Sequence, residues 1–397
     1  MNNKHPLFFV LFAFLSASVE AQPFVPADDN EILERLPALL LPSPVFQEVK
    51  QLRSTLDDSP DDWTIVSRLA ERYIEIARSQ SDPRYMGYAQ AILEPWWQQS
   101  NSPPVNAFLL RAIIRQYEHD FDGATADLKE VLTVQPRNEQ AWLIKATIET
   151  IQGDYREALK SCNNLLRKSS MIRAIACQSV PASLSGKAEV SYRLLKRMVA
   201  VLPSASARET TWMLTSLGEI AWRMGLFDAA DRHFQTALST GVRDIYLLRV
   251  YGDFLLQQNR PSEVISLLSS ETRIDSLLLR LTLAEKVLGS ESLDKHITLL
   301  QARFDANRQR RSAMHKGDEA RFTLDLLGDS ERALALAKQN WQLQRESADT
   351  YILLRAALSS NNDLTVKMTI EWLAGKGTKD ILIDIIVSQQ TGRRDHV

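Results

Sequence analysis

The sequence predicts an all-α protein built of helical hairpins that stack along the chain, and two observations support this. Trp142 and Ala146 are four residues apart, so they lie on one face of a helix, and Gly153 then marks a tight turn before a second helix. That second helix carries Ala158, and small residues at positions 146 and 158 let two antiparallel helices approach closely. Because such a hairpin cannot bury its apolar face alone, the pattern should recur along the chain.

The pattern does recur, in frames that are separated by 34 residues or by multiples close to it. These frames begin at Val105, Glu139, Thr211, Ile245, Met314 and Ala348. Their spacing and their large, small and turn positions resemble the tetratricopeptide repeat (TPR), a helix–turn–helix unit of 34 residues. The resemblance implies a right-handed superhelical solenoid of about eight to nine repeats.

Some repeats are irregular, and their boundaries are harder to predict. In Ile172–Ala205, Pro181 falls inside the first helix and should kink or end it. Ser206–Thr210 is interpreted as five extra residues that delay the next frame, and the repeat near Leu279–Ala313 has the right length but a weak signature.

Four segments are expected along the chain. Residues 1–21 form a signal peptide, with a basic start, a short apolar run and the small-residue cleavage site Val19-Glu20-Ala21. Residues 22–44 form a Pro-rich arm that either docks on the protein or a partner, or is a simple tether. Residues 45–377 form the solenoid, and 378–397 form a capping helix and tail.

The signal peptide predicts export, and the apolar run is too short for a membrane anchor. The 397-residue sequence has no Asn-x-Ser/Thr acceptor, which favours a bacterial source. We therefore expect a periplasmic protein, or alternatively a secreted one, with no transmembrane span after cleavage.

Composition and motifs argue against several classes of function. A formal net charge of −2 disfavours a nucleic-acid binder or a protein attracted to anionic membranes. The six histidines show no paired ligand spacing, so neither a metal nor another cofactor is expected. The Ser292-Leu293-Asp294-Lys295 stretch has the spacing of some acyl-transfer enzymes but lacks their partner motifs. We predict that the protein is not an enzyme.

The TPR resemblance also places the two cysteines. Cys162 falls on the second helix of one repeat and Cys177 on the first helix of the next, and these helices are packing neighbours in a TPR stack. Export to an oxidising compartment would favour a disulfide between them, and the alternative is a pair of reduced thiols in the core.

The same resemblance implies a binding groove on the concave surface, formed by positions 2, 5, 9 and 12 of the first helix of each repeat. Two Trp, a Tyr and an Arg at these positions are residue types that dominate binding energy at protein interfaces. The alternative is that the aromatic residues, above all Trp222, pack between repeats. The predicted groove residues are Trp212, Thr215, Glu219, Trp222, Tyr246, Arg249 and Asp253.

The predicted function is a protein-binding scaffold or assembly factor of the cell envelope, which presents the groove to a peptide or to a partner helix. Two other classes stay open. The chain could be a structural subunit of an envelope complex that makes contact through its edges, or a module that binds glycans or the cell wall by stacking tryptophans on sugar rings.

Overall fold

A computed structural model describes residues 44–98, 103–166, 171–201, 205–309 and 316–394. The chain divides into two units, residues 1–50 and 51–397. In the first unit the described residues are 44–50, which begin helix α1 (Pro44–Asp58). The predicted signal peptide and residues 22–43 of the predicted arm lie outside the described residues. Helices α2 to α20 all belong to the second unit.

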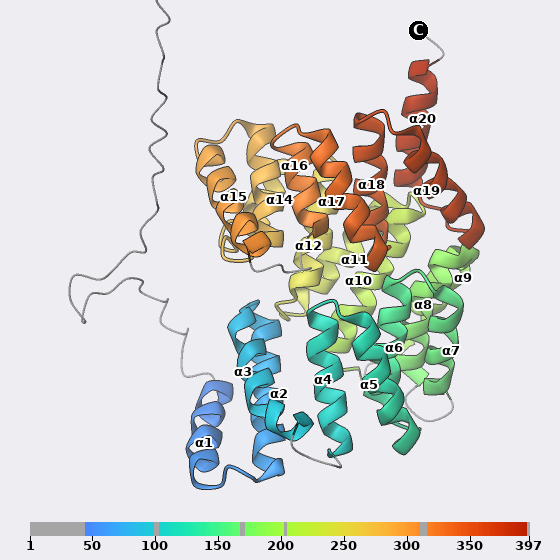
Figure 1. Cartoon of the computed structure of the whole chain (residues 1–397). Coiled ribbons are helices and arrows are strands. Elements are labelled where there is room, and N and C mark those ends of the chain that lie inside the picture. Colours follow the sequence, from blue (N-terminus) through green and yellow to red (C-terminus); the bar gives the residue numbers. More distant parts are fainter. Residues whose placement is uncertain (1–43, 99–102, 167–170, 202–204, 310–315, 395–397) are drawn as a thin grey trace, which may run out of the picture. The chain divides into compact units, whose positions relative to one another are not determined.

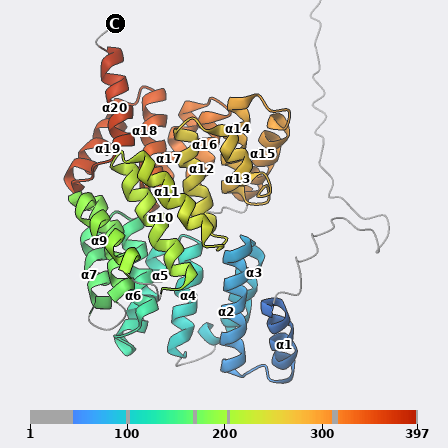
Figure 2. The same cartoon turned by 180° about the vertical axis from the view of Figure 1, so that it is seen from behind.

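Within this unit, consecutive helices pack against each other as hairpins (Figure 1). The pairs are α2 (Trp63–Gln80) with α3 (Pro83–Gln98), α4 (Val105–Tyr117) with α5 (Phe121–Val134), α6 (Glu139–Ile151) with α7 (Tyr155–Leu166), α8 (Met171–Ala182) with α9 (Ala188–Val201), α10 (Ala207–Arg223) with α11 (Phe227–Ser239), α12 (Ile245–Gln257) with α13 (Pro261–Leu268), α14 (Asp275–Leu288) with α15 (Leu293–Gln309), α16 (Lys316–Asp325) with α17 (Ser330–Leu343), and α18 (Ser347–Ser359) with α19 (Asp363–Lys376). A last helix, α20 (Ile381–Arg394), contacts α18 and α10. The described residues contain no strand, and the predicted all-α repeat fold is confirmed (Figure 2).

The predicted small positions are where the helices touch most closely. Ala221 and Ala230 are fully buried between α10 and α11. A Cβ atom at Gly218 would lie 2.5 Å from the ring of Phe234, which is also fully buried. Glycine at position 218 therefore lets the aromatic ring of α11 lie directly on the backbone of α10.

Three predicted frames coincide with helix starts, those at Ile172 and Ala348 begin one residue late, and those at Thr211 and Leu279 begin four residues late. The frame start Met314 lies outside the described residues. Helices α4, α6 and α12 begin at the first residue of their frames. Helix α10 begins at Ala207 rather than Thr211, because Ser206 caps it in a reciprocal capping box with Glu209. The residues interpreted as extra are thus the first turn of α10. Helix α14 begins at Asp275 rather than Leu279, because α13 has only 8 residues and shortens its repeat.

The expected effect of Pro181 is present. Helix α8 ends at Ala182, one residue after the proline, and a short π-helical turn, η1 (Ser183–Lys187), follows. Gly186 in this turn has φ of +84°, a left-handed conformation that glycine adopts without strain. The chain is thereby redirected before α9 begins.

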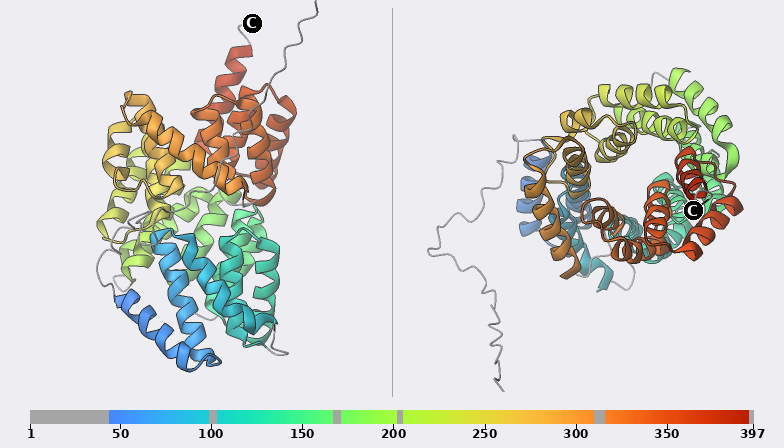
Figure 3. Two further views of the ribbon diagram at one scale, coloured as in Figure 1. Left: turned by 60° about the vertical axis from the view of Figure 1, so that its left-hand side comes forward. Right: turned by 90° about the horizontal axis from the view of Figure 1, so that it is seen from above.

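Repeats that are far apart in the sequence also touch, so the helices of the second unit close upon themselves (Figure 3). The backbone N–H of Arg345 donates to Ile151 O at 2.7 Å, and the guanidinium of Arg345 lies 4.9 Å from the ring centroid of Trp341. Trp372 packs edge-on against Trp341, and its ring approaches the backbone of Gly153. We call these five residues the closing contact.

A second set of contacts continues this closure toward the end of the chain. The hydroxyl of Thr378 donates to Leu184 O at 2.5 Å, so the segment before α20 lies against the η1 turn. Elsewhere, the Arg243 guanidinium donates to Ser79 O at 2.7 Å, which joins the α11–α12 connection to the end of α2. Contacts between repeats that are distant in the sequence therefore enclose the inner surface of the second unit.

Candidate functional site

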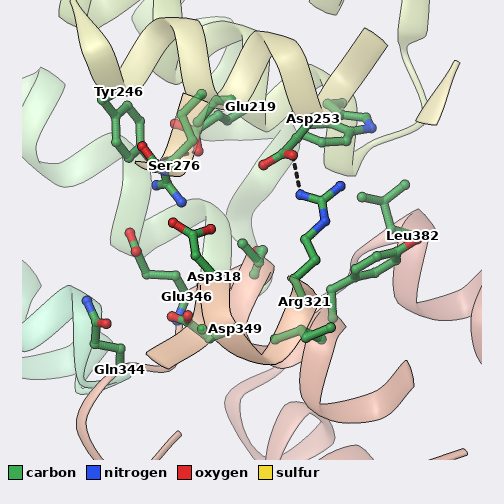
Figure 4. A pocket seen from close by; sticks show the side chains of 18 of the residues that line it. Glu219, Tyr246, Asp253, Ser276, Asp318, Arg321, Gln344, Glu346, Asp349 and Leu382 are labelled. Atoms are coloured by element: carbon green, nitrogen blue, oxygen red, sulfur yellow. Dashed lines mark hydrogen bonds and ion pairs between the residues drawn. The ribbon is translucent and has the colours of Figure 1, made fainter. Parts of the chain in front are cut away.

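The second unit encloses a central cavity of about 600 Å³. Most of its wall comes from first helices of repeats, α10, α12, α14, α16 and α18, and from the start of α20 (Figure 4). Further lining residues come from α6, α8, η1, α17 and the turn after α4. The first helices are those that the family resemblance assigns to the concave surface. The charged side chains that line the cavity are Glu219, Arg223, Arg249, Asp253, Arg280, Asp318, Arg321, Glu346, Asp349, Arg355 and Asp380.

One part of the cavity wall, which we call the neutral half, is a lattice of matched ion pairs. Arg280 is 2% exposed and binds Asp253 through two parallel hydrogen bonds of 2.9 Å. The same guanidinium contacts Asp318, and Arg321 contacts Asp253 from the other side. The lining members of the neutral half are Asp253, Asp318, Arg280, Arg321 and Arg355. Asp325 does not line the cavity but belongs to the neutral half, because it pairs with Arg321 and Arg355 behind the wall.

The charges of the neutral half therefore compensate one another. Burial alone would raise the pKa of Asp253, but Arg280 and Arg321 together hold it well below its usual range. Asp325 receives two hydrogen bonds from Arg355, at 2.6 and 3.0 Å. Each carboxylate thus has a guanidinium partner, and this wall is a rigid, charge-balanced part of the structure.

The opposite part of the wall carries more carboxylates than guanidiniums, and we call it the acidic half. Its members are Glu219, Glu346, Asp349 and Asp380 with Arg223 and Arg249. Full ionisation would give four negative charges against two positive ones. Arg249 stacks on the ring of Tyr246 at 5.0 Å and makes no ion pair within 4.0 Å with any described residue.

Burial and mutual repulsion perturb these carboxyl groups. Burial, followed by the charge of the neighbouring Glu346, raises the pKa of Asp349 to about 7, although hydrogen bonds from the Glu346 backbone and Asn340 and the charge of Arg249 oppose the shift. Burial also raises the pKa of Glu219, although Arg223 and a hydrogen bond from the Tyr246 hydroxyl at 2.8 Å oppose the shift. The raised pKa values of Glu219, Asp349 and Asp380 mean that the enclosed site opposes full ionisation of these groups, and a cation placed among them would favour their charged forms.

Tyr246 shows that these groups are enclosed although they can be reached by water. Its side chain is 41% exposed, yet that surface lies in the cavity rather than on the outside of the unit. Burial among surrounding atoms, followed by the charges of Glu219 and Glu346, raises the pKa of the phenol well above its ordinary value. Interactions in such a site are screened less than those on an open surface.

Asp380 adds a buried carboxylate at the junction of α19 and α20. It is 3% exposed, and Oδ1 accepts a hydrogen bond of 3.0 Å from the backbone N–H of Leu382. No donor among the described residues reaches Oδ2 in hydrogen-bond geometry, although Ser347 is near enough to lower the pKa that burial raises. One oxygen of a buried carboxylate in the cavity wall thus lacks a partner.

The structure brings five of the seven predicted groove residues together. Glu219, Trp222, Tyr246, Arg249 and Asp253 all line the cavity. The indole N–H of Trp222 donates to Gln257 Oε1 at 2.8 Å, and its ring packs edge-on against Phe254, so Trp222 both lines the cavity and covers the core. Trp222 is therefore both a groove residue and a residue that packs between repeats, as the two interpretations of the sequence proposed.

The other two predicted residues do not line the cavity. Thr215 is 4% exposed and its hydroxyl bonds back to Thr211 O, while Trp212 is 36% exposed at the N-terminal end of α10. The reason is that only the C-terminal part of α10 faces the later repeats. In the frame that begins at Met314, positions 2, 5 and 9 are His315, Asp318 and Phe322. Asp318 lines the cavity, but Phe322 packs against Phe304 in the core, and His315 lies outside the described residues.

Sequence reasoning missed much of the acidic half. Glu346 and Asp349 form the reciprocal capping box at the start of α18, a pattern that indicated only a helix terminus. Asp380 lies in the segment between α19 and α20, outside any repeat position. No sequence signal identified these residues, because contacts between distant repeats bring them to the cavity.

The cysteines lie in a separate place, between the α6–α7 and α8–α9 repeats. The structure joins Cys162 and Cys177 by a disulfide, with their Cα atoms 5.6 Å apart. Both sulfur atoms are in a small core with Ala146, Leu165 and Ala174. Within the described ranges, no group of His, Cys, Asp and Glu side chains is arranged to hold a metal ion. Nor does any described helix combine the length and apolarity needed to cross a bilayer.

Helical hairpins that stack through their first helices define the class of helical repeat proteins. Comparison of the sequence with known families is more specific, because residues 109–170 match the tetratricopeptide repeat model. The resemblance to the tetratricopeptide repeat family that the sequence predicts is therefore supported, and residues 109–170 carry the match. No curated protein matches the sequence significantly.

Solved structures with a similar course include tetratricopeptide repeat proteins at low identity. The hetero-tetramer of Cut9 and Hcn1 from the APC/C matches at 11% identity and a TM-score of 0.43, covering 79% of this chain and 52% of that one. The chain thus spans about half the length of that structure. A tetratricopeptide repeat protein from Parabacteroides merdae matches at 12% identity and a TM-score of 0.37, covering 83% and 99%. An IFIT1 mutant with Gppp-AAAA matches at 12% identity and a TM-score of 0.42, covering 87% of this chain and 85% of that one.

Proposed function

We propose that this chain is a non-catalytic scaffold or assembly factor of the cell envelope, and that its central cavity holds a segment of a protein partner. Tetratricopeptide repeats generally serve as protein-interaction scaffolds, which supports the class of function. Periplasmic localisation, or secretion, follows from the sequence of residues 1–21 and is part of the proposal.

The observation that carries the proposal is the coincidence of the cavity with the predicted groove. Five of the seven residues chosen from repeat positions line one cavity of about 600 Å³. A volume in this range is typical of specific ligand sites, which combine apolar walls with a few placed polar groups. Trp222, Leu256 and Ile383 supply apolar wall here, beside the charged side chains.

The experiment fills the cavity without disturbing the core. Ala348 lines the cavity and is exposed on the first turn of α18, so Ala348→Trp would occupy the space meant for the partner. Ala207 is a matched control, because it is also exposed on the first turn of a helix with a capping box, yet it does not line the cavity. The assay is crosslinked capture of partners in the native compartment by wild type, Ala348→Trp and Ala207→Trp.

We expect one protein to be captured by wild type and by Ala207→Trp, and to be lost with Ala348→Trp. If Ala348→Trp folds and retains that partner, the cavity is not the site. Loss of the partner on Trp212→Ala would then support binding through the outer edge, since Trp212 is exposed outside the cavity. Capture of a glycan instead of a protein would favour the carbohydrate-binding alternative.

A further inference from the structure

The charge distribution of the cavity indicates what the bound segment carries. The neutral half is internally compensated, so it offers no net attraction to either sign of charge. The acidic half has four carboxyl groups and two guanidiniums, and neither Arg223 nor Arg249 forms an ion pair within 4.0 Å with a described carboxylate. An unbalanced set of buried carboxylates is costly, and a cation placed among them would relieve the cost.

A second, independent observation comes from Asp380. Its Oδ2 atom is buried in the cavity wall and no described donor meets hydrogen-bond geometry with it, although the Ser347 hydroxyl lies near enough to the carboxyl group to lower its pKa. Leaving a buried acceptor unsatisfied is unfavourable, so the position favours a donor supplied from outside the chain. Both the charge and the missing donor point to the same kind of ligand group.

The wall also suits a cation through its aromatic residues. Trp222 and Tyr246 line the cavity, and the face of Tyr246 already holds the guanidinium of Arg249. An anion would fit poorly here, because it would approach Arg249 through the surrounding carboxylates Glu219 and Glu346. Like charges brought together without compensation disfavour such binding.

From this arrangement we propose that the acidic half binds the side chain of a lysine or arginine on an extended segment of a protein partner. The inference rests on the proposed function, since it names the chemistry of the segment that the cavity would hold. A segment rather than a free cation fits the site, because the cavity is far larger than one ammonium group and has apolar walls beside the acidic half. The Gln344 amide, which also lines the cavity, can pair with a peptide group.

The test compares the binding of two peptides of the same shape but different charge to the full chain. One probe is acetyl-Ala-Ala-Arg-Ala-Ala-amide, and the other has citrulline, a neutral isostere of arginine, at its centre. Binding is measured by ligand-observed NMR at low ionic strength. We expect the arginine peptide to bind about tenfold more tightly than the citrulline peptide, as for a charge-assisted hydrogen bond in place of a neutral one.

Two variants connect the binding to the acidic half. Glu219→Gln removes one charge but keeps an acceptor for the Tyr246 hydroxyl, and it should weaken the arginine peptide about tenfold. Asp231→Asn is the matched control, because Asp231 also accepts from a tyrosine hydroxyl, that of Tyr251 at 2.8 Å, but lies outside the cavity wall. Its effect on peptide binding should be negligible.

Several outcomes would overturn the inference. Equal binding of the two peptides, no binding of either, or equal effects of Glu219→Gln and Asp231→Asn would each exclude recognition of a cation by the acidic half. Tight binding of spermidine without binding of the arginine peptide would exclude a protein segment as the source. If Ala348→Trp still abolishes capture of the partner, the proposed function survives these failures; if it does not, the proposed function fails as well.

Discussion

Arg280 offers the sharpest test of how the cavity is held together. Its side chain is 2% exposed and compensates both Asp253 and Asp318, while Nη1 also donates to Ser276 O at 2.9 Å. Arg280→Met keeps much of the apolar stem but leaves two enclosed carboxylates short of a counter-charge. Breaking a buried pair in this way typically costs about 3–5 kcal/mol in free energy of unfolding.

A matched surface variant calibrates that expectation. Arg260 makes the same two-pronged contact, with Glu263 at 2.6 Å for both bonds, and also pairs with Asp231 at 2.9 Å, but the side chains of Arg260, Glu263 and Asp231 are 28%, 52% and 23% exposed. Arg260→Met should cost only about 0–1 kcal/mol, because water and salt screen exposed pairs. Arg280→Lys keeps the positive charge but loses the planar, two-pronged geometry of the guanidinium. Its loss in free energy of unfolding should lie between those of Arg260→Met and Arg280→Met.

The assay is urea unfolding of the three variants and the wild type at one pH, followed by fluorescence and by hydrogen exchange in α12, α14 and α16. We expect Arg280→Met to show the largest loss in free energy of unfolding and the largest loss of exchange protection in α12, α14 and α16. If Arg280→Met lowers the free energy of unfolding no more than Arg260→Met does, then Asp253 and Asp318 do not depend on Arg280 for compensation of their charges.

Three further predictions follow from other parts of the structure. Because the folded pKa of Asp349 is about 7 and its unfolded value is lower, its stabilisation is complete below the unfolded value and is lost as pH rises through 7, so the melting temperature should fall more steeply from pH 6 to 8 in wild type than in Asp349→Asn. Reducing the disulfide, or replacing Cys162 and Cys177 together by Ala, should lower the free energy of unfolding by about 3 kcal/mol, as measured by urea unfolding with and without dithiothreitol. Gly153→Ala should destabilise by about 1–3 kcal/mol, since Gly153 has φ of +78° and its added Cβ would lie 2.5 Å from the ring of Trp372; an unchanged melting temperature would show that the closing contact adds no stability.

The sequence determined the repeat architecture because the forces that set it are local. A hairpin is specified by the spacing of residues such as Ala221 and Ala230, by Gly225 with φ of +75° in the turn, and by caps such as Asp120 and Asn138. These signals act within one repeat, so they can be recognised without knowing what lies elsewhere. The break after Pro181 is local in the same sense.

Local signals failed where a repeat changed its length. The short helix α13 moved the start of α14 to Asp275, and the capping box of Ser206 and Glu209 moved the start of α10 to Ala207. A fixed period of 34 residues carries no information about such changes. It also does not show which groove positions of a first helix turn toward the core, so Thr215 and Phe322 are buried although Glu219 and Asp318 on the same helices line the cavity.

Only the tertiary structure decided the composition of the cavity. Glu219 and Tyr246 could be chosen from repeat positions, but the carboxylates that face them, Glu346, Asp349 and Asp380, come from the end of the chain. They reach the site because the closing contact joins residues about 190 positions apart, such as Ile151 and Arg345. The charge of the cavity, and with it the predicted ligand, therefore depends on how far the stack of repeats turns before it meets itself, a sum of small rotations that no single repeat encodes.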